Sequence, residues 1–105
     1  MAGGGPFAIA GLWEHWQGED GEVIESCALL TTEANDLMRP IHDRMPVIVK
    51  REDFGRWLDP QAKDGKAIAA LLCPCPADRM TSYPVSTVVN NPRNENPACA
   101  ERLAL

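Results

Sequence analysis

The sequence has 105 residues, of which 45% are hydrophobic and 24% are charged, a composition typical of one soluble globular domain and not of a disordered chain. The formal net charge of -5 argues against a broadly basic protein that coats nucleic-acid phosphates. The longest apolar runs, Phe7 to Trp13 and Ala67 to Cys73, are far shorter than the about 20 residues that cross a bilayer. Residues 1–6 contain no Lys or Arg, unlike the start of a secretory signal. We therefore expect a cytoplasmic protein with no membrane contact.

The basic side chains are unevenly distributed along the chain. Residues 1–38 contain no Lys or Arg, so all ten basic side chains lie in residues 39–105.

The four cysteines are expected to be free thiols, because disulfides belong mainly to exported proteins. Cys73 and Cys75 form a C-x-C motif without the second ligand pair that zinc sites use. We therefore expect no metal and no cofactor.

The first part of the chain is predicted to form a hairpin followed by a short helix and a third strand. Residues 7–13 are apolar and short enough for a strand, and residues 17–21 are rich in glycine and acids, which is typical of a turn. Residues 23–31 then return as the second strand. A helix is expected to begin at Thr32, which can cap it, and to end at Pro40. The β-branched residues 45–50 predict the next strand.

The second part is predicted to contain two helices and a final strand. Phe54, Trp57 and Leu58 fall on one helical face. Asp64 is expected to cap a second helix, which prolines after Cys73 end. Residues 83–89 predict the last strand, with Pro84 at its beginning or at a sheet edge. The fold class is therefore α+β in a single domain, with residues 1–6 flexible and residues 90–105 an extended tail.

The densest set of chemically capable side chains lies in Pro40-Ile-His-Asp-Arg-Met-Pro46. His42 could act as a general acid or base, because loops held by rigid elements often carry such groups. It could equally serve only to hydrogen-bond the backbone at the strand entrance. Arg44 would share a side with His42 if the backbone is extended, and could then hold a phosphate near it. The alternative for Arg44 is a surface pair with Asp43 or Asp36. The residues alone leave both pairs of alternatives open.

Several segments together resemble the SOS response-associated peptidase (SRAP) family, in the same order and with similar gaps from Pro6 onward. They are residues 7–14 (FAIAGLWE), 31–46 (TTEANDLMRPIHDRMP), 57–60 (WLDP), 83–86 (YPVS) and 90–93 (NNPR). The match corresponds to roughly the second half of the family's domain, so residues 1–105 are interpreted as the C-terminal portion of a single SRAP-like domain. The resemblance implies a curved, mixed, barrel-like sheet with short helices and a groove for single-stranded DNA.

The resemblance also implies a reaction. SRAP proteins crosslink to abasic sites in single-stranded DNA through an N-terminal cysteine, whose amine and thiol condense with the sugar aldehyde, and they process their own N-terminus. By this resemblance His42 is the proton-transfer residue, Arg44 contacts a DNA phosphate, and Thr31 places a hydroxyl near the same site. Glu14 is not assigned to the family's catalytic glutamate, because its neighbours match a later strand.

One departure from the family decides what this chain is expected to do. Ala2 stands where the family has the reactive cysteine, so we expect the chain alone to form no covalent DNA adduct, and whether it acts as an enzyme stays open. Half of a curved sheet would leave strand edges and apolar faces uncovered, so we expect a homo-oligomer or complementation by the missing N-terminal half. The alternatives are a non-catalytic DNA- or partner-binding module that retains the His-Asp-Arg loop, and a metal or redox protein built on Cys73 and Cys75.

Overall fold

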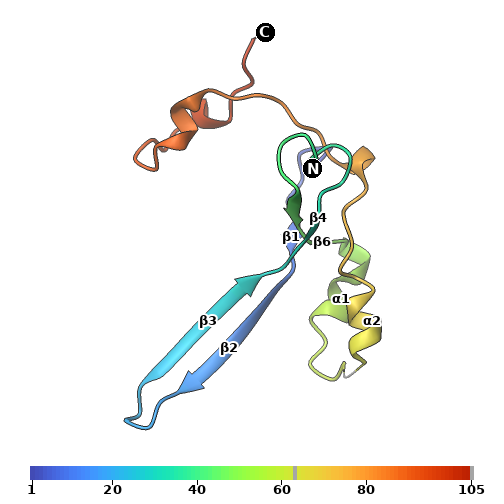
Figure 1. Cartoon of the computed structure of the whole chain (residues 1–105), viewed down its shortest axis with the longest axis vertical. Coiled ribbons are helices and arrows are strands. Elements are labelled where there is room, and N and C mark those ends of the chain that lie inside the picture. Colours follow the sequence, from blue (N-terminus) through green and yellow to red (C-terminus); the bar gives the residue numbers. More distant parts are fainter. Residues whose placement is uncertain (63, 105) are drawn as a thin grey trace.

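Three antiparallel strand pairs, followed by short helices, make up the protein in a computed structural model that describes residues 1–62 and 64–104 (Figure 1). The strands are β1 (Ala8–Ile9), β2 (Gly11–Gln17), β3 (Val23–Leu29), β4 (Thr31–Glu33), β5 (Arg44–Pro46) and β6 (Ile48–Val49). The α-helices are α1 (Phe54–Trp57) and α2 (Gly65–Ala69), and the 3-10 helices are η1 (Arg51–Asp53), η2 (Ala77–Arg79), η3 (Thr87–Asn90) and η4 (Pro97–Ala100). The α+β class is therefore confirmed.

The predicted hairpin is present as β2 paired with β3, and it projects away from the rest of the molecule (Figure 1). The register pairs Gly11 with Leu29 and Gln17 with Val23. Its turn is closed by the Gly18 amide, which donates to the Glu22 carbonyl at 2.7 Å. Gly21 has a φ of 84°, a left-handed conformation that glycine adopts without strain.

All three strand pairs meet at Ala10, Leu30 and Val47, one residue from each break between consecutive strands. The Ala10 amide donates to Val47 at 2.8 Å, the Val47 amide to Leu30 at 3.0 Å, and the Leu30 amide to Ala10 at 2.9 Å. This closed ring of three backbone hydrogen bonds satisfies groups that would otherwise be buried without partners. Ala10 and Val47 are buried here with Val49, and Leu30, Phe54 and Trp57 pack against them. The small core of the protein therefore lies at this junction.

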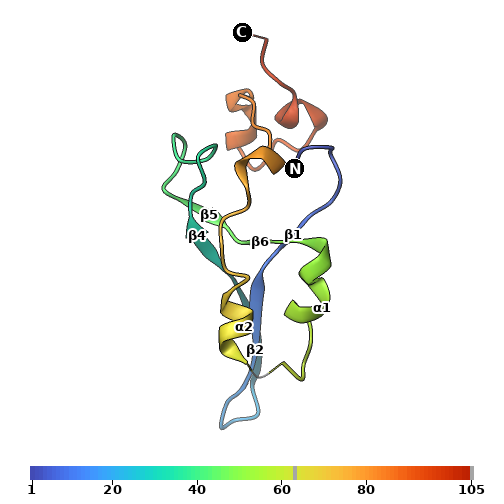
Figure 2. The same ribbon diagram turned by 90° about the vertical axis from the view of Figure 1, so that its right-hand side faces the viewer.

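The expected curved, barrel-like and mixed sheet is not what the described residues form. Each of the three sheets has two strands, and each pair is antiparallel. The pairs diverge from the junction in different directions, because one strand of every pair ends there and the next begins (Figures 1 and 2). No closed barrel is therefore found within residues 1–62 and 64–104.

The predicted helix from Thr32 to Pro40 is wrong. Thr31–Glu33 forms strand β4, which pairs with β5, and residues 36–41 form turns. Pairing with a distant strand outweighs the local capping signal of Thr32. The side chain that accepts from a free amide in this loop is that of Asn35.

The strand predicted at residues 45–50 is confirmed as two short strands, β5 and β6. The strand predicted at residues 83–89 is wrong: Val85 makes only an isolated bridge with Arg102, and the chain then turns into η3. Ser86 accepts from the Val88 amide, and such a cap favours a helical turn over an extended strand.

Both predicted helices are present, although each is short. Asp64 caps α2 as expected, because its carboxylate accepts from the amides of Lys66 and Ala67. Phe54 and Trp57 of α1 face the core as expected, whereas Leu58 is exposed. The two helices lie beside each other and next to the hairpin (Figures 1 and 2).

The C-terminal segment folds back on itself. The Tyr83 hydroxyl donates to the Ala100 carbonyl at 2.9 Å, the Arg102 guanidinium lies 5.3 Å from the centre of the Tyr83 ring, and the Leu103 amide donates to Pro84 at 2.9 Å. A cation over an aromatic face is attractive, so these contacts hold η3 and η4 together as a small lobe.

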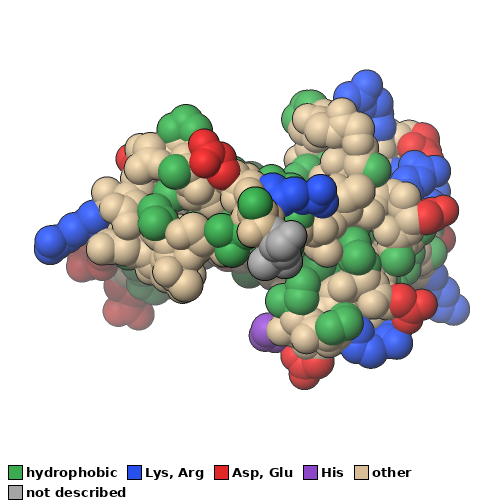
Figure 3. Space-filling view, turned by 90° about the horizontal axis from the view of Figure 1, so that it is seen from above, with side chains coloured by type: hydrophobic (Ala, Val, Ile, Leu, Met, Phe, Trp, Pro, Cys, Tyr) green, Lys and Arg blue, Asp and Glu red, His purple; other side chains and the backbone are tan. Residues whose placement is uncertain are grey.

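Large apolar side chains remain exposed in several parts of the surface. The hairpin carries the most prominent of them, including Trp13, which is 73% exposed, and green apolar side chains are visible among charged ones in Figure 3. Within the described ranges, none of the helices has the length and apolarity needed to cross a bilayer.

Candidate functional site

The β4–β5 pair places the three residues singled out by the sequence at one exposed edge. Glu33 lies opposite Arg44, and Thr31 lies opposite Pro46. Because Met45 between them is buried at 2% exposure, the alternation of a strand turns Arg44 and Pro46 outward. The Ala34 amide donates to the Asp43 carbonyl at 3.0 Å, which closes the intervening loop at its base.

Arg44 is held against the partner strand by its guanidinium. Nη2 donates to the Thr31 carbonyl at 2.8 Å and to the Thr31 hydroxyl oxygen at 3.1 Å. Thr31 and Arg44 occupy diagonal positions on one face of the pair, which long side chains can bridge. Both of these bonds come from Nη2, and Nη1 and Nε make no hydrogen bond to residues 1–62 or 64–104, so they are available to an anion. The pairing with Asp36 or Asp43 that the sequence left open is not seen in the described residues, where Asp36 instead binds Arg39 at 2.9 Å.

His42 has an exposed side chain, with 66% of its surface accessible. The Arg44 amide donates to its Nδ1 at 3.0 Å, and an Asp43 carboxylate oxygen lies 3.1 Å from the same atom. These two contacts need opposite protonation states of Nδ1. A neutral ring with its proton on Nε2 accepts from the Arg44 amide through Nδ1, whereas an imidazolium would donate from Nδ1 to the Asp43 carboxylate. The backbone hydrogen bond considered from sequence is therefore present, and it leaves Nε2 open to solvent.

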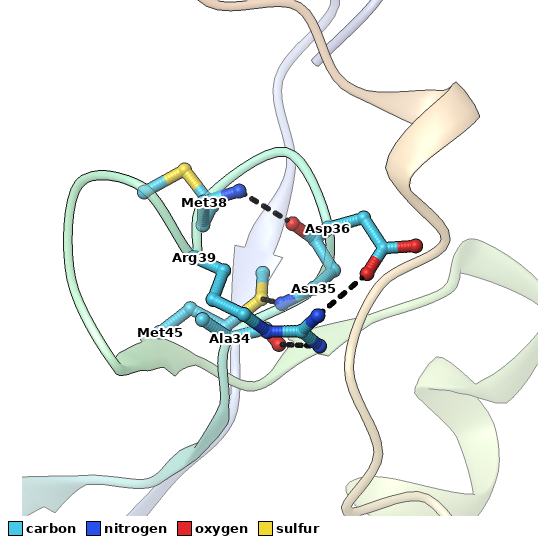
Figure 4. Close-up of polar contacts among 6 residues, drawn as sticks. All are labelled: Ala34, Asn35, Asp36, Met38, Arg39 and Met45. Atoms are coloured by element: carbon cyan, nitrogen blue, oxygen red, sulfur yellow. Dashed lines mark hydrogen bonds and ion pairs between the residues drawn. The ribbon is translucent and has the colours of Figure 1, made fainter.

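The loop that carries His42 is built around Asn35, which sequence reasoning missed (Figure 4). Asn35 is buried at 8% exposure, and its side-chain oxygen accepts from the Met38 amide at 3.0 Å. Its side-chain nitrogen donates to the Cys75 carbonyl at 2.7 Å and to the Met80 sulfur at 3.3 Å. The local signal was an asparagine just before a turn, a residue type that bonds backbone amides two or three positions on.

The C-x-C motif has a structural role at this place. The Cys75 carbonyl receives Asn35, and its thiol donates to the Pro76 carbonyl at 3.7 Å. Burial raises the pKa of the Cys75 thiol above its ordinary value, and the charge of Arg79 opposes this in part. Cys73 is exposed. No group of three potential metal ligands occurs among the residues that the structure describes.

One hollow of about 320 Å³ adjoins this edge and is lined by Glu33, Asn35 and Arg39 among others, whereas two further hollows lie away from it. One of about 430 Å³ lies between β2 and the helices, and Trp13 and Trp57 line it. Another of about 250 Å³ is lined by Lys50, Arg79 and Cys73 among others. The candidate site is therefore an exposed edge with an ordered guanidinium and imidazole.

Comparison with known proteins identifies the family. The family model described as SOS response associated peptidase (SRAP) matches residues 1–92. The chain belongs to the SRAP family. This confirms the resemblance that the HDR-containing loop and its flanking segments indicated.

Named SRAP relatives share over a third of their residues with this chain in the matched region. The abasic site processing protein YoqW of Bacillus subtilis (strain 168) is 44% identical over 95 residues, covering 90% of this chain and 42% of the relative. The abasic site processing protein HMCES of Xenopus tropicalis is 37% identical over 101 residues, covering 94% of this chain and 30% of the relative. The SRAP chain thus spans less than half the length of these curated relatives.

Two crystal structures resemble the SRAP chain in fold. A protein from Bacteroides thetaiotaomicron superposes with a TM-score of 0.79 at 28% identity, covering 93% of this chain and 44% of the other. A protein from Bordetella bronchiseptica gives a TM-score of 0.61 at 39% identity, covering 74% of this chain and 39% of the other.

Proposed function

We propose that this SRAP chain supplies the phosphate-contacting and proton-transferring part of an abasic-site processing site on single-stranded DNA. The observation that carries the proposal is the continuous hydrogen-bonded set of Thr31, Arg44 and His42 at the exposed edge of the β4–β5 pair. The names of the relatives YoqW and HMCES as abasic site processing proteins support the substrate class.

Arg44 is the phosphate contact in this proposal. The N–H groups of a guanidinium donate charge-assisted hydrogen bonds to phosphate oxygens, and the bonds to Thr31 leave Nη1 and Nε of Arg44 unused. Because Nη2 is already fixed on Thr31, part of the entropy cost of ordering the side chain is met before DNA arrives. The Thr31 hydroxyl accepts from Arg44 and keeps its own proton to donate to the same phosphate.

His42 is the proton-transfer residue in this proposal. The Arg44 amide occupies Nδ1, so Nε2 is the nitrogen that can exchange a proton with DNA or with a reacting amine. In the SRAP reaction, an N-terminal amine attacks the ring-opened sugar aldehyde, one water leaves to give a Schiff base, and the thiol of the same residue then adds to form a thiazolidine. Proton transfers accompany both the loss of water and the closing of the ring.

The chain alone is proposed to bind DNA without crosslinking to it or cleaving a peptide bond. Position 2 is Ala2, and the four cysteines stand at positions 27, 73, 75 and 99. A cysteine inside the chain has no free α-amine, and a thiazolidine needs the amine and thiol of one residue. The covalent chemistry therefore requires a polypeptide whose N-terminal residue is cysteine.

Ala2 also favours the second candidate, a non-catalytic module that keeps the His-Asp-Arg loop for DNA or partner binding. The two candidates differ in one respect: only the first restores adduct formation when a segment bearing the N-terminal cysteine is supplied. Complementation by such a segment, or self-association, fits the apolar side chains that the hairpin leaves exposed.

Fluorescence anisotropy with a labelled single-stranded oligonucleotide tests the shared claim. We expect Arg44→Ala to weaken binding about tenfold and to lower the slope of log affinity against log salt by about 0.7, the value for one lost phosphate contact on a single strand. His42→Ala should stay within about twofold of the parent affinity, because it removes no phosphate contact. Arg56→Ala is the matched control, since it removes the same charge from α1. Equal affinities for the Arg44 and Arg56 variants would refute the proposal.

A further inference from the structure

We propose that Asn35 is a positioning residue for this site, which sets the loop so that His42 and Arg44 stay hydrogen-bonded to each other. Its importance for DNA rests on the proposed function, whereas its effect on His42 can be measured without DNA. In the described residues the Asn35 side chain makes no hydrogen bond to His42 or Arg44, so it acts through the loop. Its bond to Met38 is drawn in Figure 4.

The orientation of the Asn35 amide is fixed. Its oxygen faces the Met38 amide, which can only donate, and its nitrogen faces the Cys75 carbonyl, which can only accept. A flipped amide would lose both bonds. Within the described residues, no buried side-chain nitrogen or oxygen lacks a hydrogen-bond partner, so this buried amide is fully used.

A series of hydrogen bonds connects Asn35 to Arg44. Asn35 holds the Met38 amide, and the Met38 carbonyl in turn accepts from the amides of Ile41 at 2.8 Å and His42 at 3.0 Å. The His42 ring then accepts from the Arg44 amide. The backbone carbonyl of Asn35 also accepts from the amides of Met38 at 3.2 Å and Arg39 at 2.9 Å. Loss of the Asn35 side chain should therefore loosen, without abolishing, the turn that fixes the backbone of His42.

Asn35 also connects this loop to two other parts of the molecule. Its backbone amide donates to the sulfur of Met45, the buried residue next to Arg44 on β5, at 3.4 Å. Its side chain reaches Cys75, which is 40 residues further along the chain. The neighbouring Asp36–Arg39 ion pair is exposed on both sides, and exposed pairs constrain a loop little.

Nuclear magnetic resonance of the full chain tests the proposal. In the parent protein we expect the neutral His42 ring to carry its proton on Nε2, because Nδ1 accepts from the Arg44 amide, and we expect the His42 amide to be protected from exchange. Asn35→Ala should speed exchange of that amide by about tenfold and move the ring nitrogen shifts toward an average of the two tautomers. Asn35→Ser keeps an oxygen that can accept from Met38, so it should restore the ring signature in part. Asp36→Ala is the control that should leave these signals unchanged.

DNA binding gives the second readout. Asn35→Ala should weaken single-stranded DNA binding about fivefold when Arg44 is present and have no effect in the Arg44→Ala background, which is the non-additivity of a linked pair. A parent protein that fails to bind DNA would refute the proposed function, while the His42 signals would still decide the role of Asn35.

Three results would overturn the proposal. One is a parent protein whose neutral His42 ring carries its proton on Nδ1. Another is an Asn35→Ala variant that melts at a lower temperature but keeps the His42 ring shifts and amide exchange of the parent. The third is an Asn35→Ser variant whose His42 signals match those of Asn35→Ala, because the bond to Met38 would then not be the link.

Discussion

Two cysteines separated by one residue show how strongly local burial decides side-chain chemistry. Cys73 is exposed, whereas Cys75 is buried beside the Asn35 amide and has a raised pKa. The C-x-C pattern in the sequence suggested possible metal or redox chemistry, but the pattern alone could not tell that the two thiols lie in different surroundings.

The raised pKa of Cys75 predicts how stability depends on pH. A folded-state pKa above the unfolded-state value means that the folded protein holds the thiol proton more tightly. The corresponding stabilisation is fully present below the ordinary cysteine pKa of about 8.5 and is lost as the pH rises through the folded-state value. Urea unfolding at pH 7 and above pH 9 should show this loss in the parent protein and a smaller one in Cys75→Ala. Cys73→Ala should keep the dependence of the parent, and an equal loss in all three proteins would contradict this account.

The site residues were predictable from sequence to different degrees. An extended backbone was expected to bring His42 and Arg44 to one side, and the structure joins them through the Arg44 amide and the His42 ring. The family resemblance brought in Thr31, which holds the Arg44 guanidinium. For Asn35 only the local bond to Met38 had a signal in the sequence. Its bonds to Cys75 and Met80 had none, because these partners are about 40 residues away along the chain.

Individual elements were predictable where local chemistry decides them. The hairpin turn and the Asp64 cap depend on neighbouring residues only, and both were anticipated. Residues 32 and 33 of β4 were mistaken for a helix start because their partner β5 lies across a ten-residue loop. The segment 83–89 has β-branched residues but no neighbouring strand beyond one bridge, so its strand propensity has nothing to pair with.

Glycine substitutions test the hairpin turn against a helix start. Gly21 has a φ of 84°, so Gly21→Ala should lower the free energy of unfolding by about 1 kcal/mol through backbone strain. Gly65 at the start of α2 lacks a positive φ, and a methyl group there would meet open space. Gly65→Ala should therefore be neutral or stabilising by up to about 1 kcal/mol. Thermal or urea unfolding measures both, and the same sign for the two changes would contradict the assigned conformations.

Across the whole molecule, one small core has to support elements that extend far from it. The described chain measures 54 × 35 × 25 Å, and its core lies at the ring formed by Ala10, Leu30 and Val47. Sequence patterns could not locate this ring, because each of its bonds joins residues at least 17 positions apart. Because the core is confined to this ring, the hairpin remains uncovered and exposes its apolar side chains.

The exposed hairpin predicts self-association. Trp13 and Leu29 lie on the same face of the hairpin and are both exposed. Light scattering over a range of concentrations should show dimers or larger species, because burying such a patch removes apolar surface from water. Trp13→Ser with Leu29→Ser should shift the protein toward monomer, whereas Val89→Ser in the C-terminal lobe should not. A protein that remains monomeric at all concentrations would contradict this expectation.

We propose that the chain holds the binding and proton-transfer part of an SRAP site but not the reactive amine and thiol. The most direct measurement is the intact mass of the denatured protein after incubation with a single-stranded oligonucleotide that carries one abasic site, with full-length YoqW treated in parallel. We predict that the mass of this chain stays unchanged. A species heavier by the mass of the oligonucleotide less one water, stable to denaturation, would contradict the claim.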